Sequence, residues 1–285
     1  MGTKISSATT YEASRNPIET VDDFVDVVIV ELGAMKAEGV KVRTKGPKAA
    51  MEEKELRRCI ASIWFVCYGG MQWRTIGDLT KIPFGTLYSL FSRWTRLGLW
   101  NRIMLRLAVA WRTACGDTPM PSAMCVDSRS CRSAPSCGFR GIDGGKRTKG
   151  VKFHIAADKH GSVFAVDVSP ANVHDTKGIV PVIEDLAELG FVGGALGDLG
   201  YRGGALDAIA KAVGLAGIDA VAGGRNGIFV PAGIRWTVER SFAWASFYRR
   251  LNVIFERKGE HMVAFFEIMM VSILSRRLAR MVSAR

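Results

Sequence analysis

The sequence lacks a hydrophobic run long enough to cross a membrane. Its most apolar late stretch, residues 262–274, contains Glu267 and is shorter than the about 20 apolar residues that a spanning helix needs. The first residues also lack the apolar core of a secretory signal. These absences exclude a membrane-spanning protein and favour a chain that works in a bacterial-type cytoplasm.

Cysteine pairs of the metal-binding kind are missing as well. The chain has six cysteines and four histidines, but no C-x-x-C pair, and the histidines are scattered. A structural zinc site is therefore not expected, because such sites need clustered thiolate or imidazole ligands. The cysteines are expected to be reduced thiols, as in other cytoplasmic proteins.

Acidic residues are too few to balance the basic ones. The chain has 27 Asp and Glu against 39 Lys and Arg, a net charge of +12. Such a surplus favours a polyanionic partner, since each phosphate that a basic side chain neutralises releases condensed counterions. With 285 residues, 48% of them hydrophobic, the chain can bury a core of its own, in one large domain or two modest ones.

The first part of the chain predicts helices. Residues 1–50 are weakly patterned, with one plausible helix at 21–36 and a basic linker at 41–48. Residues 51–118 are predicted to form a helical DNA-binding region, whose first helix stops at the two glycines 69–70.

A helix-turn-helix is expected inside this region. A short helix at 75–82 and a turn at 83–85 precede a second helix, capped by Thr86 and running to Leu97. Arg93 and Arg96 lie off the apolar stripe of that second helix, where they can face DNA. A small helical bundle without DNA contact would show the same periodicity.

Residues 119–285 show the pattern of a mixed α/β domain. An apolar run at 123–126 ends at Asp127, a hairpin follows at 152–158 and 162–169, and a buried strand at 193–197 leads to Asp198. The remaining stretches predict helices at 175–189, 201–213, 235–247 and 260–282 and a strand at 215–222. This order is typical of a mixed sheet with helices, and not of a sandwich or a bundle.

Three carboxylates have settings suited to metal-dependent chemistry. Asp127 and Asp198 end predicted strands, and Glu239 lies in a predicted helix. Three such charges would repel one another unless cations neutralised them, and hard oxygen ligands suit Mg²⁺ or Mn²⁺. Spacing alone leaves a second interpretation open, since an Asp after a strand is usually a turn former and a Glu on a helix usually faces solvent.

Four stretches of the chain resemble one known family. They are VDSRSCRSA (126–134), the basic loop, hairpin and N-x-x-D stretch at 143–178, LGDLGYRG (196–203), and RWTVERSFAWASFYRRLNVIFER (235–257). In this order they resemble the insertion-sequence transposases of the DDE type, in the insertion-sequence-five-like group, with a ribonuclease-H-like core. The resemblance covers about residues 51–278.

The resemblance implies a site and a mechanism. Asp127, Asp198 and Glu239 would be the catalytic triad and hold two Mg²⁺ or Mn²⁺ ions. Water would attack a phosphodiester at the transposon end, and the freed 3′-OH would attack target DNA. The implied partners are double-stranded DNA, with its terminal inverted repeats and target, and a second copy of the chain on DNA; a nucleoid-associated protein is expected.

Two positions depart from some relatives. Ala232 and Ser246 stand where a Tyr and a Lys are found in part of the family. This difference weakens the assignment to a particular subfamily more than it weakens the expected activity. A non-catalytic DNA-binding regulator, an inactive transposase relic and a metal nuclease of the same fold remain alternatives.

Basic residues near these motifs are the candidates for DNA contact. Tyr201 and the pair His174 and Asp175 lie near the acids in sequence; we expect a structural or positioning role for the pair, and for Tyr201 either core packing or a contact near Asp198. The ten predicted DNA-binding residues are Arg93, Arg96, Lys146, Arg147, Lys149, Lys152, Arg235, Arg240, Arg249 and Arg250.

Overall fold

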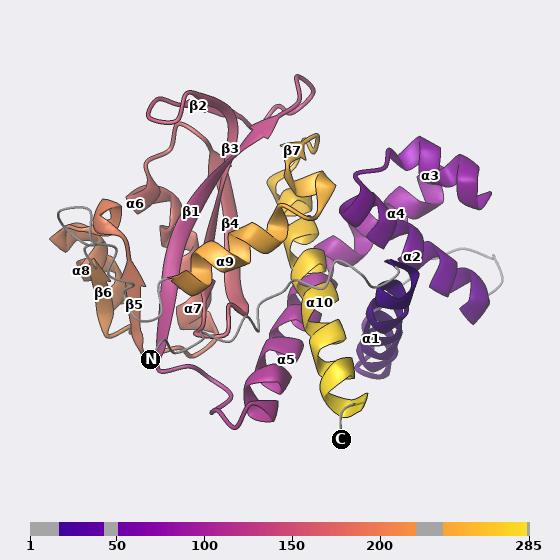
Figure 1. Cartoon of the computed structure of the whole chain (residues 1–285), viewed down its shortest axis with the longest axis horizontal. Coiled ribbons are helices and arrows are strands. Elements are labelled where there is room, and N and C mark those ends of the chain that lie inside the picture. The colour runs from indigo at the N-terminus through magenta and orange to yellow at the C-terminus, as the bar shows by residue number, and fades with distance from the viewer. Residues whose placement is uncertain (1–16, 43–50, 221–235, 284–285) are drawn as a thin grey trace, which may run out of the picture.

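The computed structural model describes residues 17–42, 51–220 and 236–283, with side chains from residue 21 onward. The molecule consists of helices packed around a mixed seven-stranded sheet (Figure 1). The mixed α/β class predicted from the sequence is therefore confirmed. Most of the predicted linker at 41–48 lies outside the described residues.

Six helices form the helical part of the molecule, on the right in Figure 1. The last helix of the chain, α10, is buried along most of its length and packs against α5, α1 and the strand β4. Because residues 262–274 are almost uniformly apolar, this helix can be enclosed on all sides. The helices are α1 (Pro17–Ala37), α2 (Glu53–Gly69), α3 (Trp73–Thr80), α4 (Phe84–Arg96), α5 (Leu99–Ala114) and α10 (Gly259–Ser283).

Two helices, α3 and α4, with a short connection between them, lie where the helix-turn-helix is predicted, and the motif itself stays a prediction. Leu87, Phe91 and Trp94 face the core, and the Phe91 ring stacks on Phe265 of α10 with centroids 4.7 Å apart. The predicted capping by Thr86 is wrong, because α4 begins at Phe84 directly after Pro83. Proline fixes a φ angle suited to a helix start, so the helix begins earlier than the threonine.

The sheet has the strand order β2-β3-β1-β5-β6. Strand β4 also pairs with β3, beyond β2 along the same edge, and β7 pairs with the far end of β1. β1, β3 and β4 are antiparallel neighbours, whereas β5 and β6 run parallel to β1. The strands are β1 (Ala123–Ser133), β2 (Gly141–Asp143), β3 (Thr148–Ala157), β4 (Val163–Pro170), β5 (Gly194–Gly197), β6 (Gly217–Ala220) and β7 (Val253–Ile254).

Strand β1 differs from its prediction in length. The sequence predicts that the strand ends at Asp127, but it continues through Asp127 to Ser133, paired with β3 as far as Arg132. The reason is that β3 is itself long and apolar, so its backbone groups hold the polar half of β1 in the sheet.

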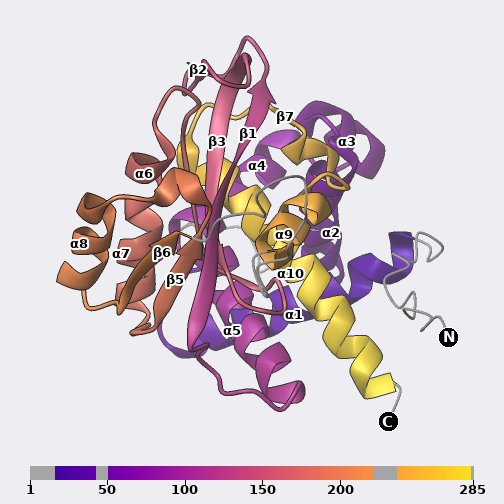
Figure 2. The ribbon, with the colours of Figure 1, turned by 60° about the vertical axis from the view of Figure 1, so that its left-hand side comes forward.

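Helices cover both faces of the sheet, as Figures 1 and 2 show from two directions. On one face α9 packs against β1 and β3, beside α10; on the other face lie α6 and α7. The predicted helix 175–189 is in fact these two pieces, α6 and α7, and Pro181 stands at the start of the second. The remaining elements are α6 (Asp175–Gly178), α7 (Val180–Glu188), η1 (Leu199–Tyr201), α8 (Gly204–Ala212), α9 (Trp236–Ala245) and η2 (Arg249–Leu251).

Among the described residues, no helix combines the length and the apolar character that a membrane crossing would require.

Candidate active site

Asp127 lies on β1, and Asp198 follows its parallel neighbour β5. Strands β1 and β5 are paired from Ala123 opposite Gly194 to Cys125 opposite Leu196, and the same offset takes Asp127 to Asp198. Residues at one level of paired strands project to the same face of a sheet. Asp198 follows the last residue of β5, at the end where the shorter strand stops.

Local hydrogen bonds hold each of these carboxylates in place. Asp127 Oδ1 accepts from the backbone N–H of Ser128 at 2.7 Å. Asp198 Oδ1 accepts from the backbone N–H of Gly200 at 2.8 Å and so caps η1. A side chain at position 200 would bring its Cβ within 2.8 Å of that oxygen, so the glycine leaves room for the cap. Both aspartates are half-buried, which leaves them within reach of a ligand.

Tyr201 is buried beside the two aspartates. Only 2% of the residue is exposed, and its hydroxyl has no hydrogen-bond partner of ordinary geometry among the described residues. Burial raises the pKa of Tyr201 well above its ordinary value, the charge on Asp127 raises it further, and the nearby Ser128 hydroxyl partly offsets this. The charges of Asp175 and Asp198 act in the same direction as that of Asp127. The phenol therefore stays protonated beside these carboxylates.

Glu239 comes from a different element, the helix α9. This helix packs on β1 and β3, and Arg129 of β1 donates to the Phe242 carbonyl at 2.6 Å. Because Asp127 and Arg129 are two residues apart on one strand, they project to the same face, the one that α9 covers. Glu239 is exposed and lies beside the buried stripe of the helix.

The three predicted acids are not gathered into one cluster in the structure. In the described ranges, no group of three or more His, Cys, Asp or Glu side chains is arranged to hold a metal ion. Asp127 and Asp198 thus belong to paired neighbouring strands or their ends, Glu239 lies on the helix α9 that packs against β1, and the catalytic triad stays a prediction.

A buried charged network lies directly behind Asp127, on the other face of β1. Ser128 donates to Asp175 Oδ1 at 2.8 Å, and Lys152 Nζ lies 3.0 Å from the same oxygen. Burial raises the pKa of Asp175, but the Ser128 and Lys152 hydrogen bonds outweigh it, so the pKa ends below its ordinary value. The sequence indicates neither contact, because the partners belong to three separate segments; the only signal was that Asp175 closes the N-x-x-D stretch.

The predicted DNA-binding residues divide into exposed and internal ones. Lys152 is buried in the network just described, and Arg250 is buried in an ion pair with Glu256 at 2.7 Å, so both serve the fold. Arg93 is half-buried and donates to the backbone carbonyl of Lys41. Those on the surface are Arg96, Lys146, Arg147, Lys149 and Arg249; Arg235 lies outside the described residues.

Arg240 belongs to a stack of alternating aromatic and guanidinium groups. Its guanidinium carbon lies 4.3 Å from the ring centre of Trp236 and 5.0 Å from that of Trp244. Arg277 of α10 continues the stack on the Trp244 ring at 4.2 Å. Burial lowers the pKa of Arg240. The arginine therefore ties α9 to α10, and its predicted contact with DNA stays a prediction.

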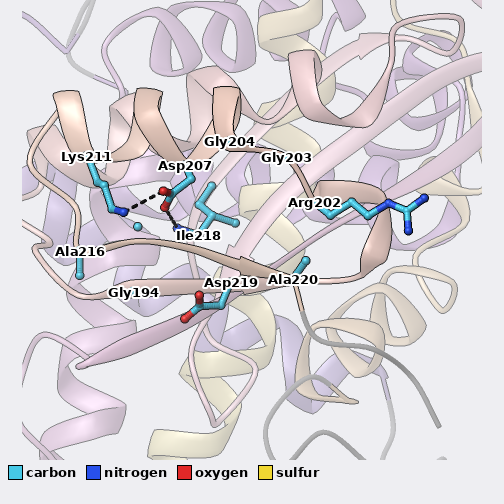
Figure 3. A pocket seen from close by; sticks show the side chains of 11 residues that line it. Gly194, Arg202, Gly203, Gly204, Asp207, Lys211, Ala216, Ile218, Asp219 and Ala220 are labelled. Atoms are coloured by element: carbon cyan, nitrogen blue, oxygen red, sulfur yellow. Dashed lines mark hydrogen bonds and ion pairs between the residues drawn. The ribbon is translucent and has the colours of Figure 1, made fainter. Parts of the chain in front are cut away.

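A separate hollow lies at the outer edge of the sheet, between α8 and β6 (Figure 3). Lys211 and Asp207 form an ion pair there at 2.8 Å, and Asp207 also accepts from the backbone N–H of Ile218 at 3.1 Å. Asp207 thus satisfies a backbone group of an edge strand. Arg202 points away from this pair in Figure 3. None of the three predicted acids lines the hollow.

Comparison with known proteins gives one match. Residues 118–217 match the family model described as the transposase DDE domain. The matched range contains Asp127 and Asp198 and ends before Glu239. No match came from the curated proteins or from the solved structures. The family match supports a DDE transposase, and a transposase acts on DNA.

Proposed function

We propose that this protein is an insertion-sequence transposase that cuts DNA at the ends of its element and joins the freed 3′ ends to a target. The observation that carries the proposal is the parallel pairing of β1 with β5, which brings the strand that contains Asp127 beside the strand that leads to Asp198. Both acids lie inside the segment that matches the transposase DDE domain. The insertion-sequence-five-like group is part of the proposal and rests on the motif resemblance.

The strand arrangement supports a ribonuclease-H-like core. Three antiparallel neighbours, β4, β3 and β1, are followed by the parallel strands β5 and β6 on the other side of β1. We assign the first acid to β1, the second to the end of β5, and the third, Glu239, to the helix α9 over the same face. In α/β sheets, ligands gather where parallel strands end.

Magnesium or manganese is the proposed cofactor, because its preferred ligands are the carboxylate oxygens that these acids carry. Asp127 and Asp198 offer carboxylate oxygens, and Mg²⁺ is usually held by one or two carboxylates together with waters and phosphates of the substrate. Glu239 is proposed as the third ligand. When bound, two such ions activate an attacking oxygen and stabilise a leaving one in phosphodiester chemistry.

The chain's own residues have the task of holding and aligning these groups. Asp127 is held by the Ser128 backbone, and Asp198 by the Gly200 backbone. Tyr201 closes the site from the interior and excludes water there, since it is almost fully buried. No side-chain base is needed for this chemistry, so His174, whose ring accepts from the backbone of Thr176, is assigned a helix-capping role.

The DNA is proposed to contact the exposed basic residues. Lys146, Arg147 and Lys149 lie on the β2–β3 hairpin, which projects from the sheet in Figure 1. Arg249 follows α9, and Arg96 lies on α4 of the helix-turn-helix. We propose terminal inverted repeats and target DNA as substrates, bound by a homodimer in the nucleoid.

The test is strand cleavage and joining in vitro, with Mg²⁺ and DNA that carries the sequences flanking the coding region. Wild type should nick the element ends and produce joined products with a target plasmid, whereas Asp198→Ala should do neither. Asp207→Ala, an acid at the sheet edge, is the matched control and should behave as wild type. Equal activity in wild type and Asp198→Ala, or none in either, would reject the proposal in favour of a DNA-binding regulator or an inactive relic. Cleavage without joining would point to a nuclease.

A further inference from the structure

The N-x-x-D stretch of the sequence has no place in the mechanism above. Its last residue, Asp175, begins α6 and accepts hydrogen bonds at one oxygen from Ser128 Oγ at 2.8 Å and from Lys152 Nζ at 3.0 Å. Ser128 in turn gives its backbone N–H to Asp127. A continuous line of contacts therefore runs from a buried lysine to the first of the two candidate metal ligands.

The lysine end of this line is fixed. The side chain of Lys152 is only 9% exposed, and its ammonium also donates to the Val173 carbonyl at 3.0 Å. Asp143 Oδ2 lies 3.8 Å from the same ammonium. A buried charge with several partners has little freedom to move, because any displacement would leave it unpaired in a poorly solvated place.

The helix that carries Asp175 is also tightly seated on the sheet. His154 of β3 is fully buried and fills the space beside Gly178, where an added Cβ would come within 2.2 Å of the ring. Its Nε2 pairs with Ser169 Oγ at 2.8 Å. The short helix α6 thus cannot shift relative to β3 without breaking this packing, and the position of Asp175 is set.

Tyr201 approaches the two candidate ligands from the interior. Its hydroxyl feels the charges of Asp127, Asp175 and Asp198 and, among the described residues, has no hydrogen-bond partner of ordinary geometry. A buried hydroxyl without a well-formed hydrogen bond is unfavourable. A proton donor placed among three carboxylates is suited to bind a carboxylate oxygen that a cation leaves free.

We infer that Asp175 and Tyr201 are positioning residues for the Asp127–Asp198 pair. Asp175 holds Ser128, and through it the orientation of Asp127; the Tyr201 hydroxyl donates to the pair once a cation is held between them. The inference rests on the proposed function, because it takes Asp127 and Asp198 to be metal ligands. Partners that orient metal ligands commonly change metal affinity about 10–100-fold when they are removed.

Tyr201→Phe is the decisive variant, because it removes one oxygen and keeps the ring. We expect Mn²⁺ to bind the full-length variant about 10–100-fold more weakly than wild type in isothermal titration calorimetry. Its thermal midpoint should change little, since among the described residues the lost hydroxyl makes no hydrogen bond of ordinary geometry. A purely structural role would leave the Mn²⁺ affinity as in wild type. Tyr88→Phe, at an exposed tyrosine on α4, is the matched control.

Asp175→Asn supplies a second, independent variant. It keeps the shape of the side chain and weakens the hold on Ser128, so Mn²⁺ affinity should fall by a similar factor. Because it also removes the charge that faces Lys152, some loss of stability is expected, and the measurement is made well below the melting temperature. Asp207→Asn, which faces Lys211 at the sheet edge, is its control.

The outcomes separate the two proposals. If wild type binds Mn²⁺ and Asp198→Ala does not, the assignment of Asp127 and Asp198 as metal ligands is supported. In that case unchanged affinity in Tyr201→Phe and in Asp175→Asn would overturn the positioning role alone. If wild type shows no Mn²⁺ binding, or if Asp198→Ala binds as tightly as wild type, both proposals fail together.

Discussion

Arg112 and Asp158 form an ion pair that is buried on both sides. The guanidinium of Arg112, on α5, donates to Asp158 Oδ2 at 2.7 Å, and the side chains are 4% and 0% exposed. The other carboxylate oxygen accepts from the backbone N–H groups of His160 and Ser162, and so shapes the β3–β4 turn. This pair joins the helical part of the molecule to the sheet.

Asp158→Ala should therefore be strongly destabilising. It leaves the Arg112 charge buried without its partner and removes two hydrogen bonds from the turn, for an expected loss of about 3–5 kcal/mol. Urea unfolding followed by circular dichroism measures the difference. Asp207→Ala removes a solvent-accessible pair with Lys211 and one hydrogen bond from the Ile218 N–H, and it should cost clearly less than Asp158→Ala. If both variants lost the same free energy of unfolding, the buried pair would stabilise the fold no more than the pair at the sheet edge does.

Glu267 makes stability depend on pH. Burial raises its pKa to about 7, the charge of Asp185 adds to this, and a hydrogen bond with Asn101 acts against it. Since the folded-state pKa is above the unfolded value, its contribution to stability is complete below about pH 4.5 and is lost as the pH rises through about 7. Glu267→Gln should remove this loss, so the variant gains up to about 3 kcal/mol over wild type at pH 8 relative to pH 4.

The measurement is urea unfolding at a series of pH values. Glu55→Gln, an exposed position on α2, serves as the control and should follow the wild-type profile. If Glu267→Gln and wild type had parallel profiles between pH 4 and pH 8, Glu267 would not titrate in that range.

The neighbouring arginines 249 and 250 should have different roles. Arg250 is buried against Glu256, so Arg250→Ala leaves a buried carboxylate unpaired and should cost about 3–5 kcal/mol. Arg249 is exposed, and Arg249→Ala should change stability by no more than about 0.5 kcal/mol. On the proposed function, the Arg249 variant should instead weaken DNA binding and reduce the salt slope by about 0.9. Thermal unfolding and DNA titrations at several salt concentrations separate the two; an unchanged slope would remove Arg249 from the DNA contact.

The exposed bases of the β2–β3 hairpin should act together on DNA. Replacing Lys146, Arg147 and Lys149 by alanine removes up to three phosphate contacts, so the salt slope should fall by about 2–3. Fluorescence anisotropy with a duplex at several salt concentrations measures it. Lys54, which is also exposed and lies on α2, supplies the control. Lys54→Ala is expected to have little effect on the salt slope. A wild-type slope in the triple variant would place the DNA elsewhere.

Gly150 is required where the paired strands β1 and β3 lie very close together. A Cβ at this position would lie 1.8 Å from the Cys131 carbonyl oxygen, a backbone atom that cannot move alone. Gly150→Ala should therefore cost about 3 kcal/mol. Gly85 lies on α4 with open space around it, and Gly85→Ala should stabilise by about 0.5–1 kcal/mol. Unfolding in guanidinium chloride compares them, and a neutral Gly150→Ala would mean that the strands can separate there at no cost.

Much of the architecture was predictable because it depends on local patterns. The stop of α2 at Gly70, which has a φ of 68°, follows from glycine chemistry, and the β3–β4 hairpin follows from two apolar runs around a turn. The strand β5 leading to Asp198 is predicted from its short apolar run. The short strands β2 and β7 were not predicted, since two or three residues carry no periodicity.

By itself the sequence determined the α/β class, the basic surplus and the three candidate acids, because composition, periodicity and short motifs are properties of neighbouring residues. Only the tertiary structure decided that β1 runs on past Asp127, that β1 and β5 are parallel neighbours, and that Lys152 and Arg250 are buried. Strand register and the burial of a charge depend on partners distant along the chain. The type of a basic residue does not show whether its side chain faces solvent or pairs with a carboxylate inside the protein.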